Sequence, residues 1–158
     1  MRRQDKNPNT PTFTYLNANP HNRFTTDCVV RAIATAMCAN QLETDINWQK
    51  LVKDMWYVVL ESLNEITEQT GFMYDEPDGY SKYLTKVGFK KMPQPRYANG
   101  TKMTLAEFVA KHPKGTYLVH LPHHLTVVVN GKHYDTWNWT RSSRRVGNYW
   151  EKLDEKQV

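Results

Sequence analysis

The sequence predicts an α+β fold, with N-terminal helices packed on a C-terminal antiparallel β-meander. Up to about residue 112, apolar residues recur mostly at the three- and four-residue spacing of amphipathic helices. After Gly115 the pattern changes to short runs of β-branched and aromatic residues joined by tight turns. Helices followed by closely connected strands are typical of the α+β class.

The first 20 residues are rich in Asn, Pro and Thr and have little hydrophobic periodicity. Such segments bury too little apolar surface to become ordered, so we expect residues 1–20 to form an extended, flexible N-terminal arm, with Phe13, Tyr15 and Leu16 as the candidates to attach its end to the body. The remainder, residues 21–158, is expected to form a single domain, because no internal repeat divides it and the length of 158 residues suits one domain.

A helix is predicted from Cys28 to about Asn40. Residue types that accept backbone N–H groups at a helix start stand just before it: Thr25, Thr26 and Asp27. An apolar face follows at helical spacing, made of Val29 or Val30, Ile33, Ala36 and Met37. Cys28 is therefore expected in the first turn of a buried helix, where the dipole and unpaired N–H groups favour a thiolate. The alternative is a small buried apolar residue, as most free cysteines are.

Three further helices and one short strand are expected before residue 115. The first runs from about 46 to 65 and is capped by Thr44 and Asp45. Its broad apolar face should be buried: Ile46, Trp48, Leu51, Val52, Met55, Val58, Val59 and Leu63. The others cover about 79–87, ended by Gly88, and 105–112, capped by Thr104. A short strand is expected in the segment FKKMP, residues 89–93.

The meander is predicted from strands at 116–121, 124–129 and 132–137, with a possible fourth within 145–153. Asn130-Gly131 is a strong signal for a two-residue type I′ hairpin turn, which fixes the register. Val129 should then oppose Lys132, and His124 should oppose Trp137. Residues two apart share a face, so Asp135 should lie diagonal to His124 and within reach of its ring.

Composition bounds the function classes. The net charge of +5 permits nucleic-acid binding but supports it weakly. No apolar run is long enough to span a membrane, and no hydrophobic segment follows Arg2 and Arg3, so we expect no secretory signal and a cytoplasmic location. On one helix, Cys28 and Cys38 would lie about 15 Å apart, too far for a disulfide. No cofactor is predicted.

A nucleophilic cysteine needs a base and a group that orients the base, and His124 and Asp135 supply both residue types. The segments DCVVRAIATA (27–36) and GTYLVHLPHHLTVVVNGKHYDTW (115–137) resemble the cysteine and histidine–aspartate parts of the papain-like cysteine peptidase superfamily, in its small bacterial and phage-encoded members. The resemblance implies a papain-like catalytic domain with Cys28 as nucleophile, His124 as base and Asp135 as orienting residue. It also implies an oxyanion-binding side chain before the cysteine, for which Asn22 is the candidate, together with the Cys28 backbone N–H.

These residues predict a thiol hydrolase or acyl transferase that cleaves a peptide or amide bond through a Cys28 thioester. A peptide or protein is the expected substrate. Four residues near the triad are candidates for the substrate groove: His123, Trp137, Asn138 and Trp139. Asn138 is also the alternative orienting residue, since Asp and Asn both serve in such triads. For the two tryptophans, simple core packing is an equal alternative.

Two other readings compete. One is a metal site built from His120, His123, His124 and His133 with Asp135; Pro122 prevents the helix that a helical zinc motif needs. The other is a catalytically silent protein of the same fold, of phage type, that binds a host protein or a nucleic acid. Its candidate contact is the basic loop Arg141–Arg145, whose alternative is a solvated turn.

Overall fold

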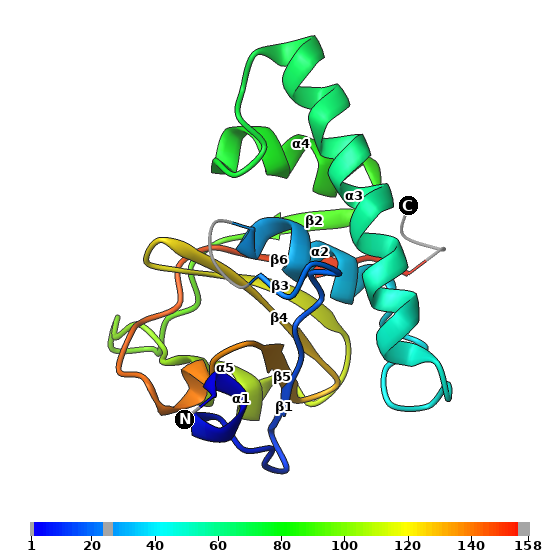
Figure 1. The fold of residues 1–158 in the computed structure, drawn as a ribbon. Helices are drawn as coiled ribbons and strands as arrows, with labels where there is room; N and C mark the ends of the chain where they lie inside the picture. Colours follow the sequence, from blue (N-terminus) through cyan, green and yellow to red (C-terminus); the bar gives the residue numbers. More distant parts are fainter. Residues whose placement is uncertain (1, 24–26, 155–158) are drawn as a thin grey trace.

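The computed structural model describes residues 2–23 and 27–154. Within them, a six-stranded mixed sheet has the strand order β1-β5-β4-β3-β6-β2 and is flanked by helices (Figure 1). The helices are α1 (Arg3–Lys6), α2 (Cys28–Met37), α3 (Trp48–Thr70), α4 (Pro77–Lys86) and α5 (Leu105–Lys111), with a short 3-10 helix η1 (Trp139–Arg141). The strands are β1 (Phe13–Tyr15), β2 (Phe89–Met92), β3 (Thr116–Leu121), β4 (His124–Val129), β5 (Lys132–Asp135) and β6 (Tyr149–Lys152). The α+β class is therefore confirmed.

The predicted meander forms, with β3, β4 and β5 paired antiparallel in succession and Val129 opposite Lys132. The expected opposition of His124 and Trp137 is wrong, because β5 ends at Asp135. The Asp135 carboxylate accepts the backbone N–H of Thr136 at 2.6 Å, so that N–H is not available to continue the ladder. Strand β5 therefore ends two residues earlier than predicted, at Asp135 instead of Trp137.

The sheet separates two hydrophobic cores. Successive side chains along each strand point to opposite faces of the sheet, and apolar residues occupy both faces. On one face, α2 packs against β3 and β4 and is covered in turn by α3 (Figure 1). The sheet residues of this core include Leu118, Leu125, Val127 and Trp150. On the other face, α5 contributes Leu105, Phe108 and Val109, which pack with Tyr117, Val119, Leu121 and Val128. Burial on both faces makes the central strands a rigid support for residues at their ends.

The expectation of a flexible arm over residues 1–20 is wrong for residues 2–20. Strand β1 pairs in parallel with β5, so that Phe13 lies opposite His133 and Tyr15 opposite Asp135. Phe13 is fully buried, and the buried side chain of Asn7 accepts the backbone N–H of Asn138 at 2.8 Å. The segment is ordered because β5 offers an open edge that needs hydrogen bonds and Phe13 fills a place in the core.

Helix α3 departs from its expected bounds, which were 46–65. It begins at Trp48 and ends where Gly71 adopts a left-handed conformation with φ of 79°. Ile46 precedes the helix and is 94% exposed, and Leu51 and Val58 are also exposed. The residues that are buried follow one narrower stripe at helical spacing: Val52, Trp56, Val59, Leu63 and Ile66. Thr44 and Asp45 do not cap α3, because the residue that precedes its first turn is Asn47.

The remaining elements agree with the sequence more closely. Thr104 caps α5 through a capping box, in which its hydroxyl accepts the N–H of Glu107 and the Glu107 carboxylate accepts the N–H of Thr104. Helix α4 begins two residues before its expected start. Strand β2 lies within the predicted segment 89–93, and β6 lies within 145–153 and pairs with both β2 and β3.

Candidate active site

Cys28 is the first residue of α2, and its side chain is half-buried at the bottom of a groove. This groove, which we call the catalytic groove, has a volume of about 470 Å³. Its lining comes from the start of α2, the start of α4 and the β3–β4 turn: Cys28, Val29, Asp75, Glu76, Pro77, Tyr80, His120, Pro122, His123, His124 and Leu125. The cysteine is therefore accessible from solvent at the N-terminal end of a buried helix.

His124 connects Cys28 to Asp135. Its Nε2 lies 2.7 Å from the Oδ2 of Asp135, and its ring is near enough to Cys28 for the two groups to shift each other's pKa. Because Nε2 is engaged by the carboxylate, Nδ1 is the nitrogen that faces the sulfur. The ring of Trp139 lies 5.1 Å from the imidazole and covers one side of it. The predicted diagonal reach between His124 and Asp135 is confirmed.

The pKa values of Cys28 and His124 move in opposite directions from their ordinary values. Burial alone would raise the pKa of Cys28, but it is lowered overall by the hydrogen bond and charge of His124, the Leu125 backbone N–H and the Arg31 charge. Burial alone would lower the pKa of His124, but the Asp135 carboxylate and Cys28 raise it to about 9. Both shifts favour a thiolate facing an imidazolium over a neutral thiol facing a neutral imidazole.

Asp135 is buried and accepts hydrogen bonds on both oxygens. Besides His124 and the Thr136 N–H, it accepts from the Thr126 hydroxyl at 2.7 Å and from Arg31 Nη1 at 3.3 Å. Burial would raise the pKa of this carboxyl, but the charges and hydrogen bonds of its neighbours hold it well below its usual range. Asp135 therefore stays ionised and can stabilise a charged His124.

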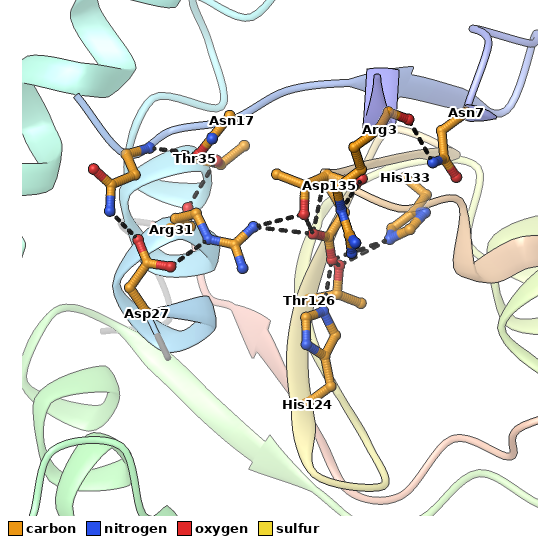
Figure 2. A network of polar contacts seen from close by, with 12 residues as sticks. Arg3, Asn7, Asn17, Asp27, Arg31, Thr35, His124, Thr126, His133 and Asp135 are labelled. Carbon is orange, nitrogen blue, oxygen red and sulfur yellow. Dashed lines mark hydrogen bonds and ion pairs between the residues drawn. The ribbon is translucent and has the colours of Figure 1, made fainter. Parts of the chain in front are cut away.

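A second buried carboxylate lies on the other side of Arg31 (Figure 2). Arg31 Nε donates to Asp27 Oδ1 at 2.8 Å, and Asn19 Nδ2 donates to Asp27 Oδ2 at 2.5 Å. The expectation that Asp27 caps α2 with its side chain is therefore wrong, since its carboxylate is directed to Arg31 and Asn19 instead. The other two expected caps, Thr25 and Thr26, lie outside the described residues. Arg31 thus connects the start of α2 to the carboxylate that orients His124.

His133 completes the polar network on the strand side (Figure 2). Its Nε2 lies 2.8 Å from the Thr126 hydroxyl oxygen. The single Thr126 proton is donated to Asp135, so His133 Nε2 must donate to Thr126. Complete burial lowers the pKa of His133, which keeps the ring neutral. At 3.8 Å from Asp135, a neutral His133 forms no ion pair and serves to fix the orientation of the Thr126 hydroxyl.

The structure does not bring Asn22 to the nucleophile. Asn22 is exposed, has a left-handed φ of 59°, and lines a separate hollow of about 660 Å³ that Cys28 does not line. Its backbone N–H donates to the Asn19 carbonyl in a turn, and that turn carries the side chain to this other hollow. The expected role of Asn22 as oxyanion donor is therefore not supported by its position.

Of the four residues expected in the substrate groove, only His123 lines the catalytic groove and Trp139 contacts His124. Trp137 lies instead between two guanidinium groups, 5.1 Å from that of Arg3 and 5.6 Å from that of Arg141. Asn138 is buried, and its side chain accepts the Thr140 N–H at the start of η1. Since its side-chain oxygen caps η1, it does not act as the alternative orienting residue for His124.

The two alternative sites are the histidine-rich metal site and the basic loop of residues 141–145. In the part of the chain that the structure describes, no group of three or more His, Cys, Asp or Glu side chains could hold a metal ion. The basic loop is partly tied to the body, because Arg144 lies over the Trp139 ring at 4.8 Å and Arg145 pairs with Glu107 at 3.5 Å. Both arginines remain exposed, so the loop still presents positive charge to solvent.

Three neighbours of the site were missed from the sequence, and two of them, Arg31 and Thr126, left a signal there. Arg31 is a charge within an otherwise apolar helix and stands four residues after Asp27, which is the spacing of a helical ion pair. Thr126 stands two residues after His124 on the same strand face. Tyr80 left no signal, because its place on the groove depends on how α4 packs on the sheet.

No protein-family model, curated protein or solved structure matches this chain. Within residues 2–23 and 27–154, no helix has both the length and the apolar character to cross a membrane. Any function must therefore be argued from the side chains that the fold brings together.

Proposed function

We propose that this protein is a cysteine-dependent hydrolase or acyl transferase of the papain-like type, which cleaves a peptide or amide bond through a thioester on Cys28. The observation that carries the proposal is the line Cys28–His124–Asp135, in which the thiol pKa is lowered and the imidazole pKa is raised. A half-buried cysteine with an ordinary structural role has no need of such a pair, and burial alone would move its pKa the other way.

In this mechanism the Cys28 thiolate attacks the carbonyl carbon, and the carbonyl electrons move to the oxygen. The backbone N–H of Cys28, at the open start of α2, is the proposed donor to that oxyanion. His124 gives its proton to the leaving amine, and the carbon–nitrogen bond breaks to leave a thioester. Neutral His124 then takes a proton from water, or from another nucleophile, as it attacks the thioester and releases Cys28. Asp135 holds the ring in position and stabilises the imidazolium in both half-reactions.

The first experiment measures the rate at which iodoacetamide alkylates each cysteine between pH 5 and 9, by peptide mass spectrometry. Cys38 is an internal control, because it is buried and burial raises its pKa. We expect Cys28 to react rapidly at pH 6 and Cys38 to react slowly. His124→Ala should abolish the low-pH reaction of Cys28, whereas His120→Ala, which removes another imidazole that lines the groove, should preserve it.

The proposal fails if Cys28 reacts slowly at pH 6, with the pH profile of an ordinary thiol, or if His124→Ala leaves its profile unchanged. That result would favour the non-catalytic alternative, in which the fold serves to bind a partner.

A further inference from the structure

The walls of the catalytic groove differ in charge. One wall, from the segment that leads into α4, carries the carboxylates of Asp75 and Glu76. Both residues are exposed, and neither forms an ion pair within residues 2–23 and 27–154. The carboxylates of Asp27 and Asp135, beneath the groove, are both paired with Arg31. The negative charge of the α4 wall is therefore available to a ligand.

The floor of the groove holds an unpartnered polar atom. Tyr80 is 1% exposed, and its hydroxyl has no hydrogen-bond partner in the described chain. The ring packs on Trp150 with centroids 5.3 Å apart, and the residue lines the groove beside Cys28. Burial and the nearby Cys28 charge raise the pKa of Tyr80, so the hydroxyl stays protonated and keeps its lone pairs as acceptors. A buried polar atom of this kind is normally satisfied, and here a donor from a ligand could satisfy it.

The opposite wall carries little free positive charge. It is formed by His120, Pro122 and His123 around the β3–β4 turn. Burial, and the charges of His123 and His124, lower the pKa of His120, which favours its neutral form. The imidazolium of His124 is compensated by Asp135. A cation entering the groove therefore meets two carboxylates without an ion pair on one side, and among the described residues that line the other side there is no guanidinium or ammonium group.

Beyond the β3–β4 turn the sign of the charge reverses. His120 and Pro122 also line a second hollow of about 400 Å³, whose other residues include Lys102, Arg144 and Arg145. This neighbouring hollow repels a cation and so directs it toward the α4 wall. Since His124 must protonate the leaving amine, the leaving part of a substrate lies on the His124 side, and the α4 wall faces the acyl part.

We infer that the catalytic groove selects substrates whose acyl part carries a cationic side chain, lysine or arginine, held by Asp75 and Glu76 at the wall and by the Tyr80 hydroxyl at the floor. The ammonium or guanidinium group supplies N–H donors to the two carboxylates and the hydroxyl. This inference rests on the proposed function and names its substrate class: peptides or amides with a basic residue on the acyl side of the scissile bond.

The test uses three chloromethyl ketones that differ only in the acyl-side residue: acetyl-lysine, acetyl-norleucine and acetyl-glutamate derivatives. Each alkylates a reactive cysteine with loss of chloride, and the second-order rate constant at Cys28 is measured by mass spectrometry at pH 7 and low salt. We expect the lysine reagent to react about tenfold faster than norleucine, its uncharged counterpart, with glutamate the slowest. The preference should weaken in 0.5 M salt.

Substitutions in the groove test which residues cause the preference for the lysine reagent. Asp75→Asn with Glu76→Gln should bring the lysine-to-norleucine ratio close to one, and Tyr80→Phe should reduce it while the fold is retained, because the lost hydroxyl has no partner to leave behind. The matched control is Asp78→Asn, an exposed carboxylate in the first turn of α4 that does not line the groove, and it should leave the ratio unchanged.

Equal rates for the lysine and norleucine reagents, or a faster glutamate reagent, would overturn the cationic preference even if iodoacetamide still labels Cys28 rapidly at pH 6. The cationic preference would also be overturned if Asp78→Asn lowers the lysine-to-norleucine rate ratio as much as Asp75→Asn with Glu76→Gln does. Slow reaction of Cys28 with every reagent, including iodoacetamide, would instead overturn the proposed function.

Discussion

Arg31→Met is the substitution with the largest expected effect on stability. Arg31 is 6% exposed at its side chain and contacts two buried carboxylates, Asp27 at 2.8 Å and Asp135 at 3.3 Å. Methionine keeps much of the side-chain length but removes the charge, so both carboxylates lose a cation while they stay buried. Removing one partner of a buried ion pair costs about 3–5 kcal/mol, because the remaining charge is desolvated without compensation.

For a chain of this size, each kcal/mol shifts the midpoint of thermal unfolding by about 2–4 °C, so Arg31→Met should lower Tm by roughly 6–20 °C. The matched control is Lys50→Met. Lys50 also pairs with a carboxylate four residues away in a helix, Asp54 at 2.8 Å, but the two side chains are 75% and 59% exposed. Such a pair contributes about 0.3–0.5 kcal/mol, so this Tm should fall by only about 1–2 °C.

The assay is circular dichroism at 222 nm during heating, repeated as urea unfolding at 25 °C. The reasoning is refuted if Arg31→Met and Lys50→Met lower Tm by the same amount. Adding Asp27→Asn to Arg31→Met should recover part of the loss, because Asp135 keeps its contact with His124 whereas the charge of Asp27, which has lost Arg31, is then removed. A double variant less stable than Arg31→Met would show that the charge of Asp27 is not the source of the penalty.

Asp135→Asn removes the charge that raises the pKa of His124, so alkylation of Cys28 by iodoacetamide at pH 6 should slow by about tenfold or more; an unchanged rate would show that the carboxylate does not support the imidazolium. Once a substrate is found, the rate of hydrolysis should fall above about pH 9, because His124 then loses the proton that the leaving amine needs. On the acid side, the rate should rise with an apparent pKa below the ordinary pKa of a cysteine, because the pKa of Cys28 is lowered. A rate that still rises at pH 10 contradicts this assignment. Thr104→Ala breaks the capping box with Glu107 and should lower the free energy of unfolding by about 1 kcal/mol in urea titration while Cys28 alkylation is unchanged; loss of alkylation would mean that α5 supports the site.

The local patterns in the sequence were sufficient for the meander and for the contact between His124 and Asp135. The Asn130-Gly131 turn set the hairpin register, and that register with the two-residue alternation placed His124 near Asp135. These predictions succeeded because they depend on contacts between neighbouring segments. The α5 cap at Thr104 succeeded for the same reason, since its donor and acceptor lie within one turn.

Contacts between distant segments could not be predicted in the same way. The parallel pairing of β1 with β5 joins segments whose sequences contain no mutual signal, so residues 1–20 were expected to be flexible. The position of Asn22 depends on the turn that begins at Asn19, and proximity to Cys28 in sequence did not bring it to the groove. The exposed Ile46 and Val58 show that the width of an apolar stripe overstates burial when a helix is covered on one side only.

The pairing of β1 with β5 has a consequence for how the chain is completed. The β5 backbone next to the site forms two hydrogen bonds with this segment: His133 N–H donates to the Thr12 carbonyl at 2.8 Å, and the Asp135 carbonyl accepts the Leu16 N–H at 2.9 Å. During synthesis, residues 12–16 are made before β5 and stay unpaired until it follows. Until the two meet, β5 is an unprotected edge strand, open to pairing with other chains. Pairing of β1 with β5 therefore covers a backbone edge that lies directly beside Asp135.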